Sequence, residues 1–405
     1  MAGLIFNGTT MSDSLDARQK KPSFAPQLTR LQPGGVAPLF LLLSKIGSGT
    51  ALQVKHGFWT ETLPFVSLKI TADVTAAATS IAVTDSSQTI PGQIYQYPKT
   101  GENILVTAVA DGTHVTVRRA FGNVAAGVMT AADNVSLYHV GNAYEEASGR
   151  PQSQRLQQSY IDNYTQIFRT GWSISGTAMS EEFYQEAGGN PMGKDKTDAA
   201  LLHMMDVERN LIFGQKYMNV LNGRPIHTMD GIIALLNQYA PSHVTAAAAT
   251  TNYDQLETAL EPCFDTVIAG TTNERIGFTG SAGLKVVNGI GRLSGEYQLL
   301  DNQTIFGMQF KSFRTTRGIF HLMEHPIFNS NPVWSSMLLA MDLTQLRVMY
   351  LAGRKSQHKY WGANGELATD NSIDAVGGVI TSELTLESRN PGACALITGL
   401  TKAAA

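Results

Sequence analysis

The stretch DKTDAALLHMMDVERNLIFGQKY, from Asp195 to Tyr217, is the longest strongly patterned helical segment of this 405-residue chain. Asp195 can cap the first turn, and Asp198 follows three residues later, near the capping-box position. Lys216 falls in the last turn, where a cation suits the helix dipole. At 1.5 Å per residue such a helix spans about 35 Å. The sequence therefore predicts a spine helix, as long as a domain is wide, on which other layers pack.

The predicted helix has one broad apolar face and one polar face. The apolar face contains Val207, Ala200, Leu211, Met204, Leu201, Ile212 and Met205, and the polar face contains His203, Asp206, Arg209 and Asn210. Glu208 is the exception, because it falls inside the apolar face. Buried carboxylates are rare unless they are paired. We therefore favour a carboxylate at the rim that bonds to backbone. The alternative is a partner for an arginine of another subunit, in which case Glu208 is an interface residue.

Composition points to an assembly and away from several function classes. Charged residues make up only 16% of the chain, against about a quarter in typical soluble proteins, which favours surfaces buried in subunit contacts. The net charge of −3 argues against tight nucleic-acid binding. Cys263 and Cys394 are expected to be reduced thiols. The N-terminus does not resemble a signal peptide, and the longest apolar run, Leu39–Leu43, is too short for a membrane span.

The segments before the helix predict an arm, a long hairpin and a small β unit. Prolines break residues 1–50, which therefore read as an extended arm. Strands are predicted at 53–62 and 157–177. Between them, residues 66–140 alternate in the manner of five or six strands, and Asp111–Gly112 predicts a hairpin turn. Together with shorter helices and returning strands after the spine, this gives an α+β fold with an inserted all-β domain.

His321, Glu324 and His325 form the sequence H-x-x-E-H, the order of ligands and base in one class of zinc peptidase. That chemistry requires both histidines on one helical face. Here Pro326 and the flanking residues predict a strand, on which the two histidines lie about 13 Å apart. A zinc hydrolase using residues 321–325 therefore stays an alternative that we do not favour. With no other catalytic or cofactor motif in the sequence, we expect no enzyme activity, no cofactor and no metal.

Several stretches, in this order along the chain, resemble one branch of the major capsid proteins of tailed double-stranded-DNA phages, which share the Johnson fold. They are PGGVAPLFLLLSKIG, FWTETL, TGENILVTAV, VTVRRAFG, YTQIFRTGWSISGTAMSEE, MEHPIF, MDLTQLRVMYLAGR and LTLESRNPGACALITGL. The resemblance covers nearly the whole chain, although no single piece is a sharp signature. The resemblance implies a division of the chain into five parts. Residues 1–52 are an N-terminal arm, and residues 53–175 are an extended loop that carries the insert 66–140. Residues 176–224 are a peripheral domain with the spine helix, residues 225–313 are an axial domain, and residues 314–405 are a peripheral sheet with the C-terminal return.

The function that this resemblance implies is structural. Copies would form hexamers and pentamers of an icosahedral head around double-stranded DNA, which they contact weakly. They would assemble in the host bacterial cytoplasm and remain in the virion. Scaffold, cement and portal proteins are further candidate partners. We do not expect the chain to bind a membrane. An arm and hairpin cannot bury their apolar residues alone, so the expected interface residues are Phe58, Trp59, Tyr160, Ile167 and Phe168, with Glu208 from the spine. An encapsulin-type shell is the nearest alternative, but encapsulins generally lack so large a β insertion.

Overall fold

The computed structural model describes residues 37–61, 66–133, 136–181, 191–248, 251–265, 272–294, 300–305, 308–361 and 374–401. Contacts divide the chain into two compact units. The main unit combines Met1–Phe58 with Ile161–Ala405, and the second unit is Trp59–Tyr160. Most of the predicted arm, residues 1–36, lies outside the described residues. The fold is α+β, as the sequence predicted.

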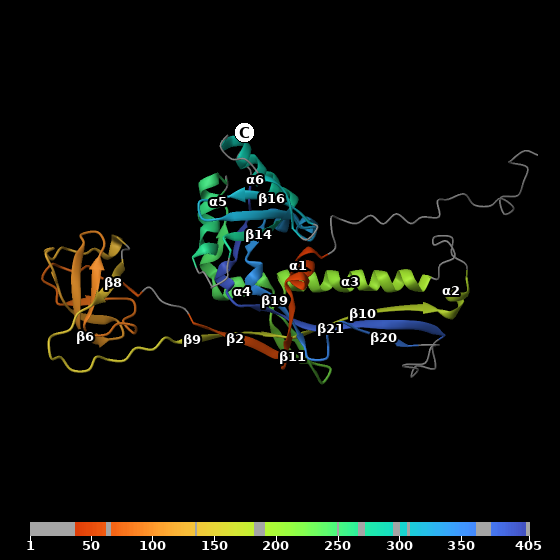
Figure 1. Cartoon of the computed structure of the whole chain (residues 1–405), viewed down its shortest axis with the longest axis horizontal. Helices are drawn as coiled ribbons and strands as arrows, with labels where there is room; N and C mark the ends of the chain where they lie inside the picture. The colour runs from red at the N-terminus through yellow and green to blue at the C-terminus, as the bar shows by residue number, and fades with distance from the viewer. Residues whose placement is uncertain are drawn as a thin grey trace, which may run out of the picture. The chain divides into compact units, whose positions relative to one another are not determined.

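The spine helix α3 runs from Pro191 to Phe213 and packs on strand β10 (Figure 1). It begins four residues before the predicted Asp195 N-cap, because proline is well tolerated in the first helical turn. It ends four residues before the predicted end. The Gly214 amide donates to Asn210 O at 2.9 Å, and Lys216 lies beyond the helix, where its amide donates to Asp230 Oδ1. The predicted boundaries, 195–217, are therefore wrong by four residues at each end.

The sheet under the spine is organised around β21, Ala375–Ser388. Strand β10, Gln166–Ser175, pairs antiparallel along ten residues of one edge of β21. Strands β19, Leu346–Leu351, and β20, Gln357–Trp361, pair in succession with the other edge. Strand β1, Ser48–Ala51, adds parallel to β19. Helix α3 and this sheet enclose one apolar core.

The end of the predicted arm is part of the main core. Residues Pro38–Ile46 form helix α1, and its side chains Leu39, Leu42 and Leu43 are fully buried. Each such burial is worth about 1.5–3 kcal/mol relative to exposure. The prediction of an extended arm is therefore wrong for this segment, since Pro38 opens the helix instead of breaking it.

The main unit also contains a sheet of seven strands, with the order β13-β22-β18-β14-β17-β16-β15. Its strands are Val244–Ala246, Ala395–Thr398, Leu338–Met341, Glu274–Thr279, Ile319–Glu324, Met308–Arg314 and Leu300–Ile305, in that order. The α-helices of this region are α4, Ile232–Tyr239, α5, Tyr253–Leu260, α6, Ser281–Ser294, and the short α7, Pro332–Ser335. Asn252 and Gln255 form a capping box on α5. Helices α5 and α6 share an apolar cluster with this sheet.

The second unit contains a six-stranded antiparallel sheet, ordered β3-β8-β5-β6-β7-β4, over the stretch predicted as all-β. The strands are Ser67–Lys69, Ser136–Asn142, Gln93–Tyr97, Glu102–Asp111, His114–Arg118 and Ser80–Ala82. The Asp111–Gly112 turn between β6 and β7 is confirmed, and Asp111 Oδ1 accepts from the Thr113 amide. Alternating side chains from the sheet form a separate core that includes Tyr95 and Tyr97.

The predicted long hairpin is shorter than expected. Strands β2, Lys55–Glu61, and β9, Gln158–Tyr164, form a two-stranded ribbon. The predicted strand at 157–177 is two strands, because Thr165 separates β9 from β10. Only β9 pairs with β2, while β10 joins the sheet of the main unit.

Candidate assembly surfaces and buried polar clusters

Helix α1 has no capping side chain of its own, because Ala37 occupies its N-cap position. The carboxylate of Glu208, on α3, takes this role from 169 residues away in sequence. Its Oε1 accepts from the Leu39 amide at 2.8 Å, and its Oε2 accepts from the Phe40 amide at 2.7 Å. These two N–H groups belong to the first helical turn, whose amides have no partner within the helix. A negative charge also suits this end of the helix dipole.

His325 is the third partner of Glu208, at 2.7 Å from Nε2 to Oε1. The Ile327 amide donates to His325 Nδ1 at 3.2 Å. That contact places the imidazole proton on Nε2, so His325 donates to the carboxylate. Both side chains are fully buried. Glu208 is thus bonded to backbone, as we favoured, but it lies in the core and not at a rim. Its side-chain partner is a histidine of the same chain, so the prediction of Glu208 as an interface residue is wrong.

The H-x-x-E-H residues do not converge on one point. His325 bonds to Glu208, whereas Glu324 Oε1 accepts from Asn329 Nδ2 at 2.7 Å. His321 Nδ1 lies 2.7 Å from Ser312 Oγ. His321 is on strand β17 and His325 directly follows it, which confirms the predicted strand. The geometry therefore gives the motif no zinc-peptidase arrangement.

His203 is buried against the sheet under the spine, although the helix pattern placed it on the polar face. Its Nε2 lies 2.8 Å from Ser382 Oγ, and its Nδ1 lies 3.1 Å from Thr170 Oγ1. Burial lowers the pKa of His203, although the nearby Asp206 carboxylate opposes the shift. The polar face of α3 is thus partly an internal face, because the sheet offers hydroxyls there.

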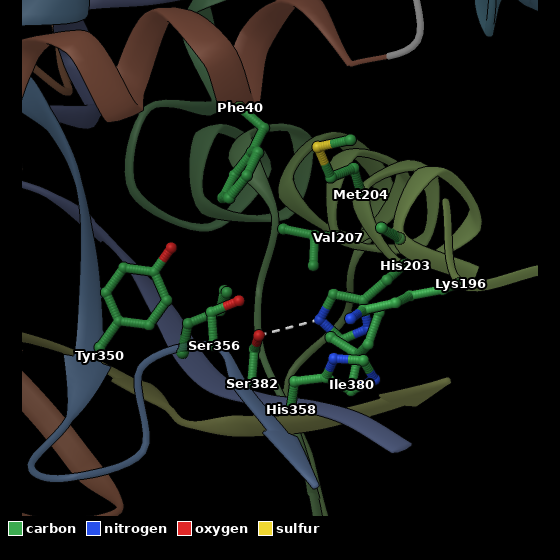
Figure 2. Close-up of a pocket in the computed structure, with 12 residues that line it drawn as sticks. Phe40, Lys196, His203, Met204, Val207, Tyr350, Ser356, His358, Ile380 and Ser382 are labelled. Atoms are coloured by element: carbon green, nitrogen blue, oxygen red, sulfur yellow. Dashed lines mark hydrogen bonds between the residues drawn. The ribbon is translucent and has the colours of Figure 1, made fainter. Parts of the chain in front are cut away.

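A cavity of about 290 Å³ lies between α1, α3 and this sheet. Figure 2 shows Lys196 and His203 from the helix and His358 from β20 around it. Trp172 Nε1 donates to His358 Nε2 at 2.9 Å. Burial, and then the Lys196 charge, lower the pKa of His358. Burial keeps both imidazoles in the neutral form, and each is bonded to a fixed partner.

The predicted interface residues differ in their exposure. In the second unit, Trp59 is 66% exposed and packs against Tyr160 in a tilted arrangement, with ring centroids 4.9 Å apart. In the main unit, Ile167 is half exposed and Phe58 is partly buried. Phe168 is buried in the main core, because it alternates with Ile167 on β10 and points to the opposite side. The prediction of Phe168 as an interface residue is corrected by that burial.

Sequence reasoning missed a strongly apolar surface at the hairpin β11–β12, Tyr217–Leu221 and Arg224–Thr228. Five large apolar side chains of this hairpin are exposed: Tyr217, Met218, Val220, Leu221 and Ile226. The signal that could have found it is Asn222–Gly223, which is the strongest short hairpin signal when apolar residues flank it.

An ion pair of the second unit and the two cysteines of the main unit are also buried. The Arg119 side chain is largely buried and bonds through Nε and Nη2 to the buried Glu102 carboxylate. Cys263 and Cys394 are free and buried, and burial raises the pKa of Cys394 to about 12.

In the part of the chain that the structure describes, no helix is both long enough and apolar enough to cross a membrane.

The amino-acid sequence matches the SU10 major capsid protein family over residues 6–401. It is 35% identical over 410 residues to the major capsid protein of Pseudomonas phage PaMx41, covering 98% of this chain and 96% of that protein. Among solved structures, this chain is similar to a chain of Mycobacterium phage Adephagia, with a TM-score of 0.46 and 7% sequence identity. That match covers 96% of this chain and 97% of the phage chain. It is also similar to a capsid chain of the native GTA particle, with a TM-score of 0.46 and 8% sequence identity. That match covers 96% of this chain and 98% of the GTA chain. A chain of the holo-SrpI encapsulin complex of Synechococcus elongatus has a TM-score of 0.44 and 12% sequence identity. That match covers 62% of this chain and 81% of the encapsulin chain.

Proposed function

The chain belongs to the SU10 major capsid protein family, and we propose that its copies assemble into hexamers and pentamers of an icosahedral phage head around double-stranded DNA. The observation that carries this proposal is the match across residues 6–401, which leaves almost no part of the chain for another role. The near-complete match to a phage major capsid protein also favours a phage head over an encapsulin-type compartment.

The exposed apolar side chains support self-assembly. Trp59 and Tyr160 form an exposed aromatic pair on the ribbon, and Ile167 faces outward on β10. Aromatic residues are enriched at the centres of protein interfaces. We assign these three residues, and the partly buried Phe58, to subunit contacts.

The mild charge of the chain supports weak contact with packaged DNA. A net charge of −3 gives the chain no overall attraction to phosphates, so the DNA can slide during packaging. Scaffold, cement and portal proteins are the further partners of this proposal, and the host bacterial cytoplasm is the site of assembly. No catalytic step belongs to it.

Negative-stain microscopy and sedimentation of the expressed full chain test the proposal. We expect closed shells, or hexameric and pentameric capsomers. A monodisperse monomer at micromolar concentration would overturn it.

A further inference from the structure

The hairpin β11–β12 carries apolar side chains on both of its faces. Paired residues share a face, so Tyr217 and Leu221 lie on one face together with Ile226. Met218 and Val220 lie on the opposite face. All five are between 42% and 64% exposed. An isolated two-stranded hairpin is marginally stable in water, so a hairpin of this composition gains stability when a partner covers it.

The turn of this hairpin is rigid. Asn222 and Gly223 both have positive φ, at 51° and 73°, which is the signature of a type I′ turn. At the base, the Thr228 hydroxyl donates to Gln215 O at 2.6 Å, and the His227 ring lies 5.9 Å from the Tyr164 ring. The hairpin is therefore preorganised for binding and loses little entropy when it docks.

Near the turn, both outer edges of the hairpin are protected against strand addition. The two-residue turn makes Leu221–Arg224 a hydrogen-bonded pair, so the backbone groups of Val220 and Pro225 point outward. Pro225 has no N–H to offer. The Val220 amide is occupied by Asn219 Oδ1 at 2.7 Å. This disfavours open-ended strand pairing near the turn and favours partners that bind through the side-chain faces.

The area of the surface favours a second copy of the same chain. Over the two faces together, the five exposed side chains present on the order of 500 Å², comparable to the largest single apolar patch on a typical monomer. A stable one-to-one interface needs about 800 Å² per partner. The hairpin alone is therefore too small for a durable pair. Repeated in every subunit of a closed shell, the same weak contact gains strength from multivalency.

We propose that the β11–β12 hairpin docks by its apolar faces onto a second copy of this chain. This inference rests on the proposed function, since it names one contact of the shell. The hairpin composition agrees with it: its only basic residues are Arg224 and His227, and it contains no Asp or Glu. Interface centres are depleted of charge and enriched in Tyr and Met.

Two measurements on the full chain test the inference. In the first, Val220→Asp is compared with Val333→Asp, because these valines are 64% and 66% exposed. We expect both variants to keep the melting temperature of the wild-type subunit. Val220→Asp should lower the yield of shells at least tenfold, and Val333→Asp should lower it much less. Equal shell yields from the two variants would contradict the inference.

In the second, photoreactive p-benzoylphenylalanine replaces Met218, or Val333 as the control, in assembled particles. Irradiation should give a dimer of the chain from position 218, and much less from position 333. A cross-link to a different virion protein only, or none, would overturn the inference, and this holds even where Val220→Asp fails to fold. If the wild-type chain forms no shells, the proposed function itself fails. Shells without the cross-link leave that function standing and refute the hairpin contact alone.

Discussion

Glu208 and His325 form a fully buried pair, with 2.7 Å between Oε1 and Nε2, and the same carboxylate caps helix α1. The pair joins the spine helix to the residue that follows strand β17. The rings of Phe278 and Phe328 flank the imidazole at centroid distances of 5.0 and 5.5 Å. Glu208 therefore ties together three segments that are far apart in sequence. This contact fixes helix α1 to the core of the subunit.

Replacing Glu208 should destabilise the subunit. Glu208→Ala leaves the amides of Leu39 and Phe40 and the His325 N–H without an acceptor, so we expect a loss of about 3–5 kcal/mol in unfolding free energy. Glu208→Gln keeps one acceptor and should cost about 1–3 kcal/mol. Urea unfolding of the variants measures both values.

The control is Asp206→Asn on the same helix, whose exposed pair with Arg209 is worth about 0–1 kcal/mol. Shell yield should fall together with subunit stability in the Glu208 variants. If Glu208→Gln abolished assembly while the unfolding free energy stayed unchanged, Glu208 would have a partner across the subunit interface after all.

The end of the spine helix gives a second prediction. A Cβ atom on Gly214 would lie 2.5 Å from Asn210 O and 2.6 Å from Met229 O, and both are backbone atoms with little room to move. Gly214→Ala should therefore destabilise the subunit by more than about 1–3 kcal/mol, the usual cost of overpacking. Gly112→Ala is the matched control, because nothing lies within 4 Å of its Cβ position. Equal melting temperatures of the two variants would show that the backbone around Gly214 can relax.

The sequence predicted the fold class, the long helix and the β segments because these depend on local periodicity. The resemblance to tailed-phage major capsid proteins is confirmed by the family match. The polar clusters could not be predicted, since they join segments that are distant in sequence. Glu208 finds the amides of α1 169 residues away, and nothing local marks His325 as its partner. Phe168 and Ile167 are neighbours of similar hydrophobicity, and only the side of β10 on which each lies decides which one is exposed.

Acidification should weaken the subunit through Glu387. The hydrogen bond from His56 lowers the pKa of this carboxyl, and Arg389 adds to the shift, although burial opposes it. Because the pKa is lower in the folded state, the stabilisation is complete above the unfolded value, near 4.5. It is lost as pH falls through the folded value, with a slope of at most about 1.4 kcal/mol per pH unit.

Glu387→Gln isolates this contribution from that of other carboxylates. Thermal unfolding should show the variant less stable than wild type at pH 7, and the difference should shrink below about pH 4.5. A difference that stays constant from pH 7 to pH 3 would mean that Glu387 acts through packing and not through its charge.

Trp59 should contribute to assembly more than to folding. Two-thirds of its surface is exposed in the subunit, and tryptophan at an interface centre often contributes 2 kcal/mol or more. Trp59→Ala should therefore raise the concentration required for shell formation by roughly 30-fold, the equivalent of about 2 kcal/mol. Melting of the unassembled subunit should change little. Val128→Ala, at a similarly exposed position in the same unit, is the control. Unchanged assembly by Trp59→Ala would remove the Trp59–Tyr160 pair from the proposed interface.

The inserted β unit should be removable without loss of the main fold. It has its own core, and its first strand, β3, pairs with its last strand, β8, through Ser67↔Tyr138. The points where the chain enters and leaves the insert are therefore close together, and a short linker can join them. We expect a chain that lacks residues 68–138 to melt cooperatively, since the main unit keeps its five-stranded and seven-stranded sheets. Its shells should dissociate at lower urea concentration than wild-type shells. Shells of unchanged stability would indicate that the insert is an external decoration, and failure of the shortened chain to fold would show that the main unit depends on it.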